Sequence, residues 1–199
     1  MAIITLTGPT CAGKSTVEAA LQKIGFGRAV SHTTRLPRAG EYNGGSYHFV
    51  SDEEFATLNA QGAFVETVAF GSNKYAMSAA ALRAAQDESG NVAIVVEPHG
   101  ASQIHAFCLL NGIKSQSVWI DCSVKDQAQR WLTRLAGDML IGKDFIGPYA
   151  DRLQLMLSDE AEWREHAYSV HGIHYDMMFN SSENSPEQIA EKIAKFVNS

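Results

Sequence analysis

The stretch Ala2-Ile-Ile-Thr-Leu-Thr-Gly8-Pro-Thr-Cys-Ala-Gly13-Lys14-Ser15 decides the fold of this 199-residue chain. A β-branched run stops at Gly8-Pro9, and helix formers follow from Ser15 to Ile24. Between strand and helix, the pattern G-x-x-x-x-G-K-[ST] predicts a loop whose backbone N–H groups surround a phosphate chain. Lys14 supplies charge to the terminal phosphates, and the Ser15 hydroxyl is a ligand for Mg²⁺. The stretch predicts nucleoside triphosphate binding and leaves the phosphate acceptor open.

Outward from this stretch, buried strands and helices alternate along the chain. We expect further strands at 91–97, 117–121 and 176–179, and helices at 79–86, 102–110, 124–135 and 149–166. A final amphipathic helix places Ile189, Ile193 and Phe196 on one face. The alternation predicts an α/β fold, a parallel-sheet P-loop kinase core covered by helices.

Residues 31–78 differ in composition from the rest of the chain: they are rich in Gly, Tyr, Thr and Arg and contain short segments in which polar and apolar residues alternate. We expect one domain, 1–199, whose core comprises residues 1–30 and 79–199 and whose acceptor-binding lobe is inserted at about 31–78. A flexible lid is expected at about 130–152, because residues 136–148 (AGDMLIGKDFIGP) place three glycines and a proline between two helices.

Composition excludes several classes of function. Lys plus Arg number 16 against 22 Asp plus Glu, a net charge of -6, which argues against binding nucleic acid or an anionic membrane through bulk charge. No run approaches the roughly 20 apolar residues of a membrane span, and the N-terminus lacks a basic, apolar leader, so we expect a cytoplasmic protein. The three cysteines lack the spacing of a zinc site or a disulfide scaffold.

A second motif, Ser31-His-Thr-Thr-Arg35-Leu-Pro-Arg38, places two arginines three residues apart beside a proline. Together with Tyr47, two guanidinium groups can hold a phosphate monoester by charge-assisted hydrogen bonds. The same pattern is also typical of a solvated basic turn, and the motif alone does not separate the two interpretations.

With these motifs the chain resembles the guanylate kinases, which transfer the terminal phosphate of ATP to GMP. The resemblance rests on five stretches and continues more loosely to Asn180: Gly8 to Thr16, S-x-T-T-R-x-P-R-x-G-E from Ser31 to Glu41, Tyr47 to Phe55, Phe64-Val-Glu66, and Tyr75. It implies a nucleoside monophosphate kinase that uses ATP and Mg²⁺.

The resemblance also implies roles for individual residues. It implies that ATP is held by Gly8, Ala12, Gly13, Lys14, Ser15, Thr16, Arg130 and Asn180. It implies that the acceptor is held by Ser31, Arg35, Arg38, Tyr47, Glu66, Tyr75, Ser78 and Glu97. It further implies that the catalytic cations are Lys14, Arg35, Arg134 and Arg152, and we expect Ser15 and Glu97 to be the metal-binding residues.

Glu66 suits guanine, because a carboxylate can accept hydrogen bonds from the N1–H and the 2-amino group, which adenine and pyrimidines do not offer together. The base pocket departs from the family at two places. Tyr75-Ala-Met77 stands where the family has Tyr-Gly-[Ser/Thr], and Val95 stands where it has the first of two acids. We therefore expect Met77 and Val95 to line the base pocket, with Ser78 as the substitute donor.

Three functions remain open. The first is an ATP-dependent kinase for GMP or dGMP. The second is a related P-loop kinase acting on another deoxy or modified-base nucleoside monophosphate, or on a sugar bisphosphate. The third is a non-catalytic guanylate-kinase-like binding module, against which the intact phosphate loop argues, because such modules lose it. The sequence leaves the oligomeric state open.

Overall fold

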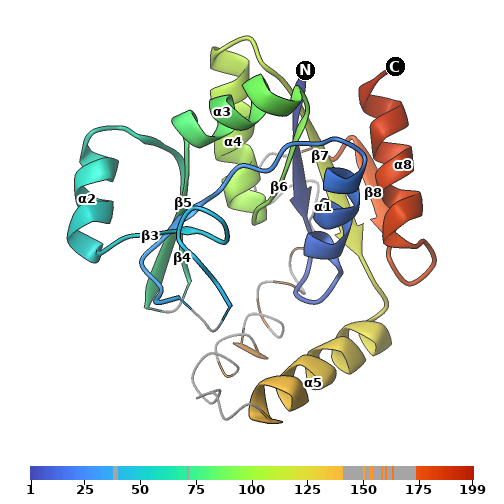
Figure 1. Ribbon diagram of the computed structural model, residues 1–199. Helices are drawn as coiled ribbons and strands as arrows, with labels where there is room; N and C mark the ends of the chain where they lie inside the picture. Colours follow the sequence, from blue (N-terminus) through green and yellow to red (C-terminus); the bar gives the residue numbers. More distant parts are fainter. Residues whose placement is uncertain are drawn as a thin grey trace.

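The computed structural model describes residues 1–37, 40–70, 72–140 and 174–199, and residues 150, 153–154, 158, 160 and 163. These residues include two four-stranded sheets, one in the core and one in a smaller lobe (Figure 1).

The core sheet is parallel throughout, in the order β6-β1-β7-β8. Its strands are β1 (Ala2–Thr7), β6 (Val92–Val95), β7 (Lys114–Asp121) and β8 (Met177–Asn180). Every residue of β1 is buried, as expected for the central strand of a sheet that is covered on both faces. The predicted α/β fold is confirmed, and β1 has the predicted bounds.

Helices cover both faces of this sheet (Figure 1). On one face, α1 (Lys14–Lys23) packs against α8 (Pro186–Val197), and the apolar core joins Ile4 and Leu6 to Leu21 and Ile193. On the other face, α3 (Ala79–Ser89) and α4 (Pro98–Leu110) cover Ile3 and Ile94. Alternate residues of β1 thus enter opposite cores, which fixes the strand between the helix layers.

Two predictions about helices need correction. In α8 the buried stripe is Ile189, Ile193 and Val197, whereas Phe196 is 40% exposed, because spacing of four residues keeps Val197 on the inner face. Helix α5 (Val124–Leu140) runs beyond the predicted end at residue 135, so residues 136–140 of the predicted lid are helical. One glycine, Gly137, costs about 1 kcal/mol in a helix and does not stop it. Residues 141–149 and 151–152 of the predicted lid lie outside the described residues.

The smaller lobe has its own sheet in the order β3-β2-β5-β4. Its elements are β2 (His32–Thr33), β3 (His48–Phe49), α2 (Asp52–Ala60), β4 (Phe64–Phe70) and β5 (Asn73–Ser78). Strands β4 and β5 form an antiparallel hairpin, and a capping box between Ser51 and Glu54 begins α2. All these elements lie within the range predicted for the inserted lobe, and α4 of the core packs against β4.

None of the described helices combines the length and the apolar character that crossing a membrane requires.

Candidate active site

The loop from Gly8 to Ser15 joins β1 to α1 and packs closely against the backbone of β7 at Ile120. Gly8 has φ 138°, and a Cβ there would lie 2.0 Å from the carbonyl oxygen of Ile120, so only glycine fits. The Lys14 ammonium donates to the carbonyl oxygens of Gly8 (2.6 Å) and Pro9 (2.8 Å). These contacts hold its positive charge over the loop.

The first turn of α1 favours an anion. Gly13 is the N-cap, and no acidic residue occupies the first turn of this helix. The positive end of the helix dipole therefore faces the loop without a neutralising carboxylate from the same turn. Ser15 and Thr16 follow directly and line the cavity in front of the loop.

Arg130 of α5 is hydrogen-bonded to the phosphate loop and to the turn after β8. Its Nη1 donates to the carbonyl oxygen of Cys11 (3.2 Å) and to Ser181 Oγ (2.9 Å), and its Nη2 donates to the carbonyl oxygen of Ser181 (3.1 Å). Ser181 Oγ in turn donates to the carbonyl oxygen of Ala12 (2.7 Å). Helix α5, the loop and the turn after β8 are thereby held in one arrangement, and Arg134 lines the same cavity one turn further along α5.

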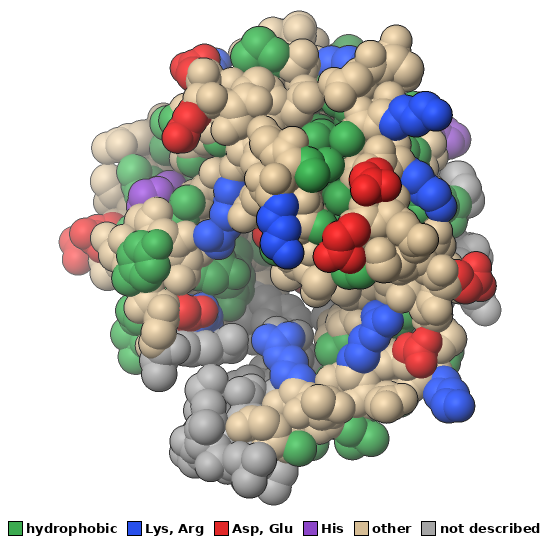
Figure 2. Space-filling model, turned by 45° about the vertical axis from the view of Figure 1, so that its right-hand side comes forward, with side chains coloured by type: hydrophobic (Ala, Val, Ile, Leu, Met, Phe, Trp, Pro, Cys, Tyr) green, Lys and Arg blue, Asp and Glu red, His purple; other side chains and the backbone are tan. Residues whose placement is uncertain are grey.

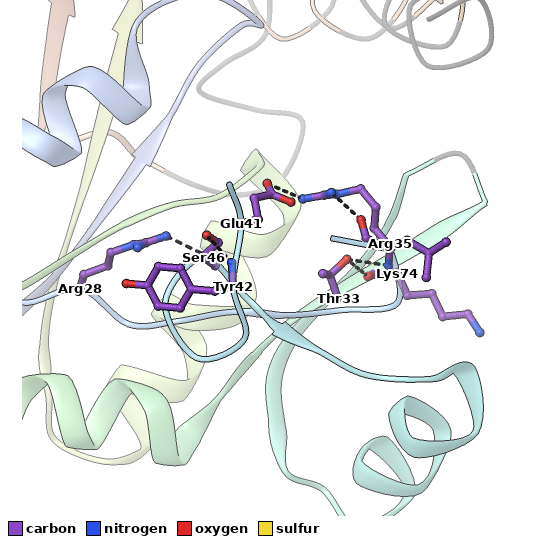
Figure 3. A network of polar contacts seen from close by, with 8 residues as sticks. Arg28, Thr33, Arg35, Glu41, Tyr42, Ser46 and Lys74 are labelled. Atoms are coloured by element: carbon purple, nitrogen blue, oxygen red, sulfur yellow. Dashed lines mark hydrogen bonds and ion pairs between the residues drawn. The ribbon is translucent and has the colours of Figure 1, made fainter. Parts of the chain in front are cut away.

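Arg35 of the lobe is oriented by its neighbours (Figure 3). Its Nη2 pairs with Glu41 at 2.9 Å, its Nη1 donates to the carbonyl oxygen of Leu36 at 2.8 Å, and its guanidinium lies 5.4 Å from the centre of the Tyr47 ring. These two hydrogen bonds use two of the five N–H donors of the guanidinium. The arginine is thus fixed in direction while it keeps donors for a ligand.

Two tyrosines lie beside this arginine. The ring centres of Tyr47 and Tyr75 are 6.0 Å apart in an edge-on arrangement. Burial, and then the neighbouring Tyr75, raise the pKa of Tyr47 above its ordinary 10.0. The Tyr47 hydroxyl therefore stays protonated at neutral pH and can donate a hydrogen bond to an anion.

Glu66 of β4 is a buried carboxylate, 6% exposed. Burial raises its pKa, a hydrogen bond from the backbone of Met77 lowers it and nearby Glu97 raises it, and the resulting pKa is about 7. A Cβ on Gly100 of α4 would lie 2.8 Å from Glu66 Oε1, so the glycine makes room for the carboxylate. Core and lobe together shape this end of the site.

Two cavities adjoin at the phosphate loop. One reaches toward Ser31, Glu66 and Glu97, and the other lies over the loop and is lined by Ser15, Arg35, Arg130 and Arg134. The residues that line both are Thr10, Lys14, Tyr47, Tyr75 and Val95. In Figure 2, basic side chains gather on both sides of the hollow between the lobe and α5. The arrangement gives space for two phosphorylated ligands that meet at Lys14.

Several predicted site residues lie elsewhere. Ser78 caps α3, since its hydroxyl accepts the N–H of Ala81 at 3.1 Å, and it does not line either cavity. The side chain of Asn180 is bonded within its own turn, to Glu183 and to the N–H of Ser182. Ala12 is fully buried with its methyl group in the apolar core, and its carbonyl oxygen accepts the Ser181 hydroxyl. Arg38 and Arg152 lie outside the described residues.

The expectation that Met77 lines the base pocket is wrong. Met77 is 2% exposed and packs in the core with Leu82 and Ile94, and the pocket is lined instead by Ala76. Regular alternation along β5 would place Tyr75 and Met77 on the same face, yet Tyr75 lines the cavity and Met77 enters the core beside α3. Val95 does line the cavity, as expected.

The two residues predicted to bind Mg²⁺ face different cavities, Ser15 over the phosphate loop and Glu97 beside Glu66. In the part of the chain that the structure describes, no group of three His, Cys, Asp or Glu side chains could hold a metal ion. A hydroxyl at the loop fits an Mg²⁺ ion that arrives on nucleotide phosphates, because this ion keeps most of its water and phosphate ligands. Ser15 therefore fits the ion and Glu97 lies outside that cavity.

Two residues that support the site were not among the predicted ones. Arg28 donates to the carbonyl oxygens of Gly45 (2.7 Å) and Ser46 (3.1 Å), just before Tyr47 (Figure 3). Glu18 of α1 lies near Arg28, and burial raises its pKa to about 7. No local pattern marks these residues, because their partners are distant in sequence.

Comparisons with known proteins agree with this geometry. The family model described as guanylate kinase matches residues 1–142. The guanylate kinase of Shewanella oneidensis is 32% identical over 171 residues, 84% of this chain and 78% of that protein. That of Schizosaccharomyces pombe is 39% identical over 108 residues, and the match spans about half of each protein (52%). The crystal structure of guanylate kinase from Anaplasma phagocytophilum has a TM-score of 0.67 and 24% identity, covering 99% of this chain and 84% of that one, which supports the fold.

Proposed function

This chain belongs to the guanylate kinase family of nucleoside monophosphate kinases, and we propose that it transfers the terminal phosphate of ATP to GMP or dGMP. One observation carries the choice of acceptor. The cavity that adjoins the phosphate loop has the buried carboxylate of Glu66 among its lining residues, and it shares Tyr47, Tyr75 and Lys14 with the cavity over the loop.

Glu66 selects guanine by hydrogen bonding. An ionised carboxylate accepts from the N1–H and the 2-amino group on one edge of guanine, whereas adenine offers an acceptor at N1 and no 2-amino group. A site built to meet polar groups discriminates strongly against a ligand that leaves them unpaired. Ser31 lines the same cavity and offers a hydroxyl to the base.

The phosphate of the acceptor lies at the other end of this cavity, toward Arg35, Tyr47 and Tyr75. The guanidinium and the two phenol groups hold it by hydrogen bonds, and we include Arg38 in this set because the resemblance implies it. Ionic and hydrogen-bonded contacts from several directions fix the acceptor oxygen for attack on the terminal phosphate of ATP.

Phosphoryl transfer needs positioning and charge neutralisation more than covalent chemistry. The loop amides and Lys14 hold the phosphates of ATP, while Arg134 approaches from α5 and Arg35 from the lobe. Mg²⁺, held at Ser15 together with the phosphates, neutralises charge on the migrating group when it is bound. We include Arg152 in the same task, because the resemblance to guanylate kinases implies it.

The test is ADP formation from ATP and Mg²⁺ with GMP, dGMP, AMP, dAMP, CMP, UMP, dUMP and dTMP as separate acceptors. We expect turnover with GMP or dGMP to exceed that with every other acceptor by on the order of 100-fold or more. Preferred turnover with another base, or with a sugar bisphosphate added to the panel, would overturn the guanine assignment and leave the P-loop kinase assignment in place.

A further inference from the structure

A buried carboxylate that the proposed reaction does not use lies against the phosphate loop. Glu160 is 1% exposed. Its Oε1 accepts the backbone N–H of Thr10 at 2.5 Å, and its Oε2 accepts Nε2 of Gln127 at 2.6 Å. Both carboxylate oxygens therefore have partners, and the two partners belong to segments far apart in sequence.

The two partners belong to the two parts of the structure that face the phosphates of ATP. Thr10 lies inside the phosphate loop, two residues after Gly8 and four before Lys14. Gln127 lies on α5, three residues before Arg130 and seven before Arg134. Spacings of three and seven residues place these side chains on the same face of the helix. One carboxylate thus joins the loop to the face of α5 that carries both arginines.

A buried carboxylate beside the phosphate loop is electrostatically unfavourable unless it has a function there. A carboxylate beside a loop that binds phosphates opposes an anionic ligand, and burying any charge is costly unless its hydrogen bonds are made. Gln127 is itself buried, 2% exposed, so the contact is closed to water. The two hydrogen bonds offset part of this free-energy cost, and they also fix the loop relative to α5.

We propose that Glu160 is a positioning residue for the donor site, which sets the conformation of the phosphate loop at Thr10 and, through Gln127, the approach of Arg130 and Arg134. The inference rests on the proposed function only in its donor half, the binding of ATP at the phosphate loop. Glu160 also lines the cavity that holds Ser31 and Glu66, so binding of the ATP analogue is measured without an acceptor present.

A reciprocal exchange of the two side chains tests the proposal. Gln127→Glu places two carboxylates against each other, and Glu160→Gln replaces the carboxylate by an amide. In the double variant the amide at position 160 still accepts from Thr10 and now donates to the carboxylate at position 127. The hydrogen-bond pattern is restored with its charge moved from one side chain to the other. Gln61→Glu adds the same charge at an exposed site outside both cavities, as the control.

The measurements are the Kd of a non-hydrolysable ATP analogue, the Tm, and the amide resonance of Thr10 in a ¹H–¹⁵N spectrum. We expect Gln127→Glu to weaken binding about 10-fold or more and to shift the Thr10 resonance, and the double variant to recover a Kd within about threefold of wild type. If the charged variant does not fold, Gln127→Leu removes one hydrogen bond without adding charge, and a weakened Kd with a shifted Thr10 resonance is again the expected result.

Two results would overturn the proposal. A lower Tm with an unchanged Kd would mean that the contact only stabilises the fold. A double variant as weak as Gln127→Glu would mean that the position of the charge matters and the hydrogen-bond geometry does not. Absence of GMP phosphorylation by the wild-type enzyme would count against the proposed acceptor and would leave these binding results unaffected.

Discussion

The two ends of the site are built in different ways. At the phosphate loop, one continuous stretch from Gly8 to Ser15 supplies backbone N–H groups, a helix N-terminus and a lysine. At the base end, Ser31, Glu66 and Glu97 come from separate segments and meet only in the folded protein. Local backbone geometry makes the first end, and tertiary packing makes the second.

The difference affects how easily each end is disturbed. The loop is held by close backbone contacts, such as that of Gly8 with Ile120. Several backbone N–H groups can donate to the phosphates, so binding does not depend on one group. The base end depends on one carboxylate whose burial raises its pKa to about 7, and this carboxylate fits only because Gly100 has no side chain. Small changes there are expected to alter specificity before they alter stability.

The largest effect is expected at the phosphate loop. Lys14→Met removes the only charge that the loop itself carries, and we expect kcat to fall on the order of 1,000-fold with Tm little changed. Steady-state kinetics of ADP release measure this. Lys23→Met, in the last turn of α1, is the matched control. A binding module would keep its ligand affinity in the Lys14 variant, so undiminished function would contradict the kinase assignment.

A smaller effect is expected where the two cavities meet. Arg35→Met removes the guanidinium from the acceptor phosphate, and we expect kcat/KM for GMP to fall on the order of 100-fold while the KM for ATP stays nearly constant. Lys74→Met breaks an exposed ion pair with Asp52 in the same lobe and should change neither value by more than about twofold. Equal increases in both KM values would place Arg35 outside the acceptor site.

The base end predicts a pH dependence. Guanine requires ionised Glu66, and with a pKa of about 7 this group is mostly protonated in more acidic solution. We expect kcat/KM for GMP to be about tenfold lower near pH 6 than near pH 8. Dividing the wild-type profile by that of Glu66→Gln cancels titration of the GMP phosphate. A flat ratio would contradict the role of Glu66.

The same shift affects stability, with a defined sign. The folded protein holds the Glu66 proton up to about pH 7, whereas the unfolded chain releases it near the ordinary value of 4.5. The folded state binds more protons in this window, so the free energy of unfolding declines as the pH rises through it. Urea unfolding of Glu66→Gln should show a weaker decline than the wild type between these two pH values.

The smallest effect is expected from a methyl group. Gly100→Ala would place Cβ 2.8 Å from Glu66 Oε1, so the carboxylate must move. We expect the KM for GMP to rise about three- to tenfold with the KM for ATP unchanged. Gly137→Ala, at a helical glycine with nothing within 4 Å, is the control and should leave both KM values unchanged. Equal effects of the two variants would remove any special role from the Gly100–Glu66 contact.

Sequence reasoning succeeded where one short segment carries the information. The bounds of β1 and the parallel core were predictable because β-branched runs and helix formers alternate around a glycine motif. The start of helix α2 could also have been predicted, because Ser51 and Glu54 have the spacing of a capping box, but no helix was predicted there.

Sequence reasoning failed where a side chain could face either of two environments. Met77 lies next to pocket residues along β5 and yet enters the core, and a bulge between Phe64 and Glu66 changes the register of the hairpin. The partners of Glu160 are 33 and 150 residues away, at Gln127 and Thr10. No pattern of local spacing carries such contacts.

The central claim is that Glu66 recognises the edge of guanine, and a comparison of GMP with inosine monophosphate, which lacks the 2-amino group, tests it most directly. The account predicts that the wild-type enzyme prefers GMP by about 10-fold or more in kcat/KM, and that in Glu66→Gln this preference falls to within about threefold. An unchanged preference in the variant would contradict the account and assign base recognition to another part of the cavity.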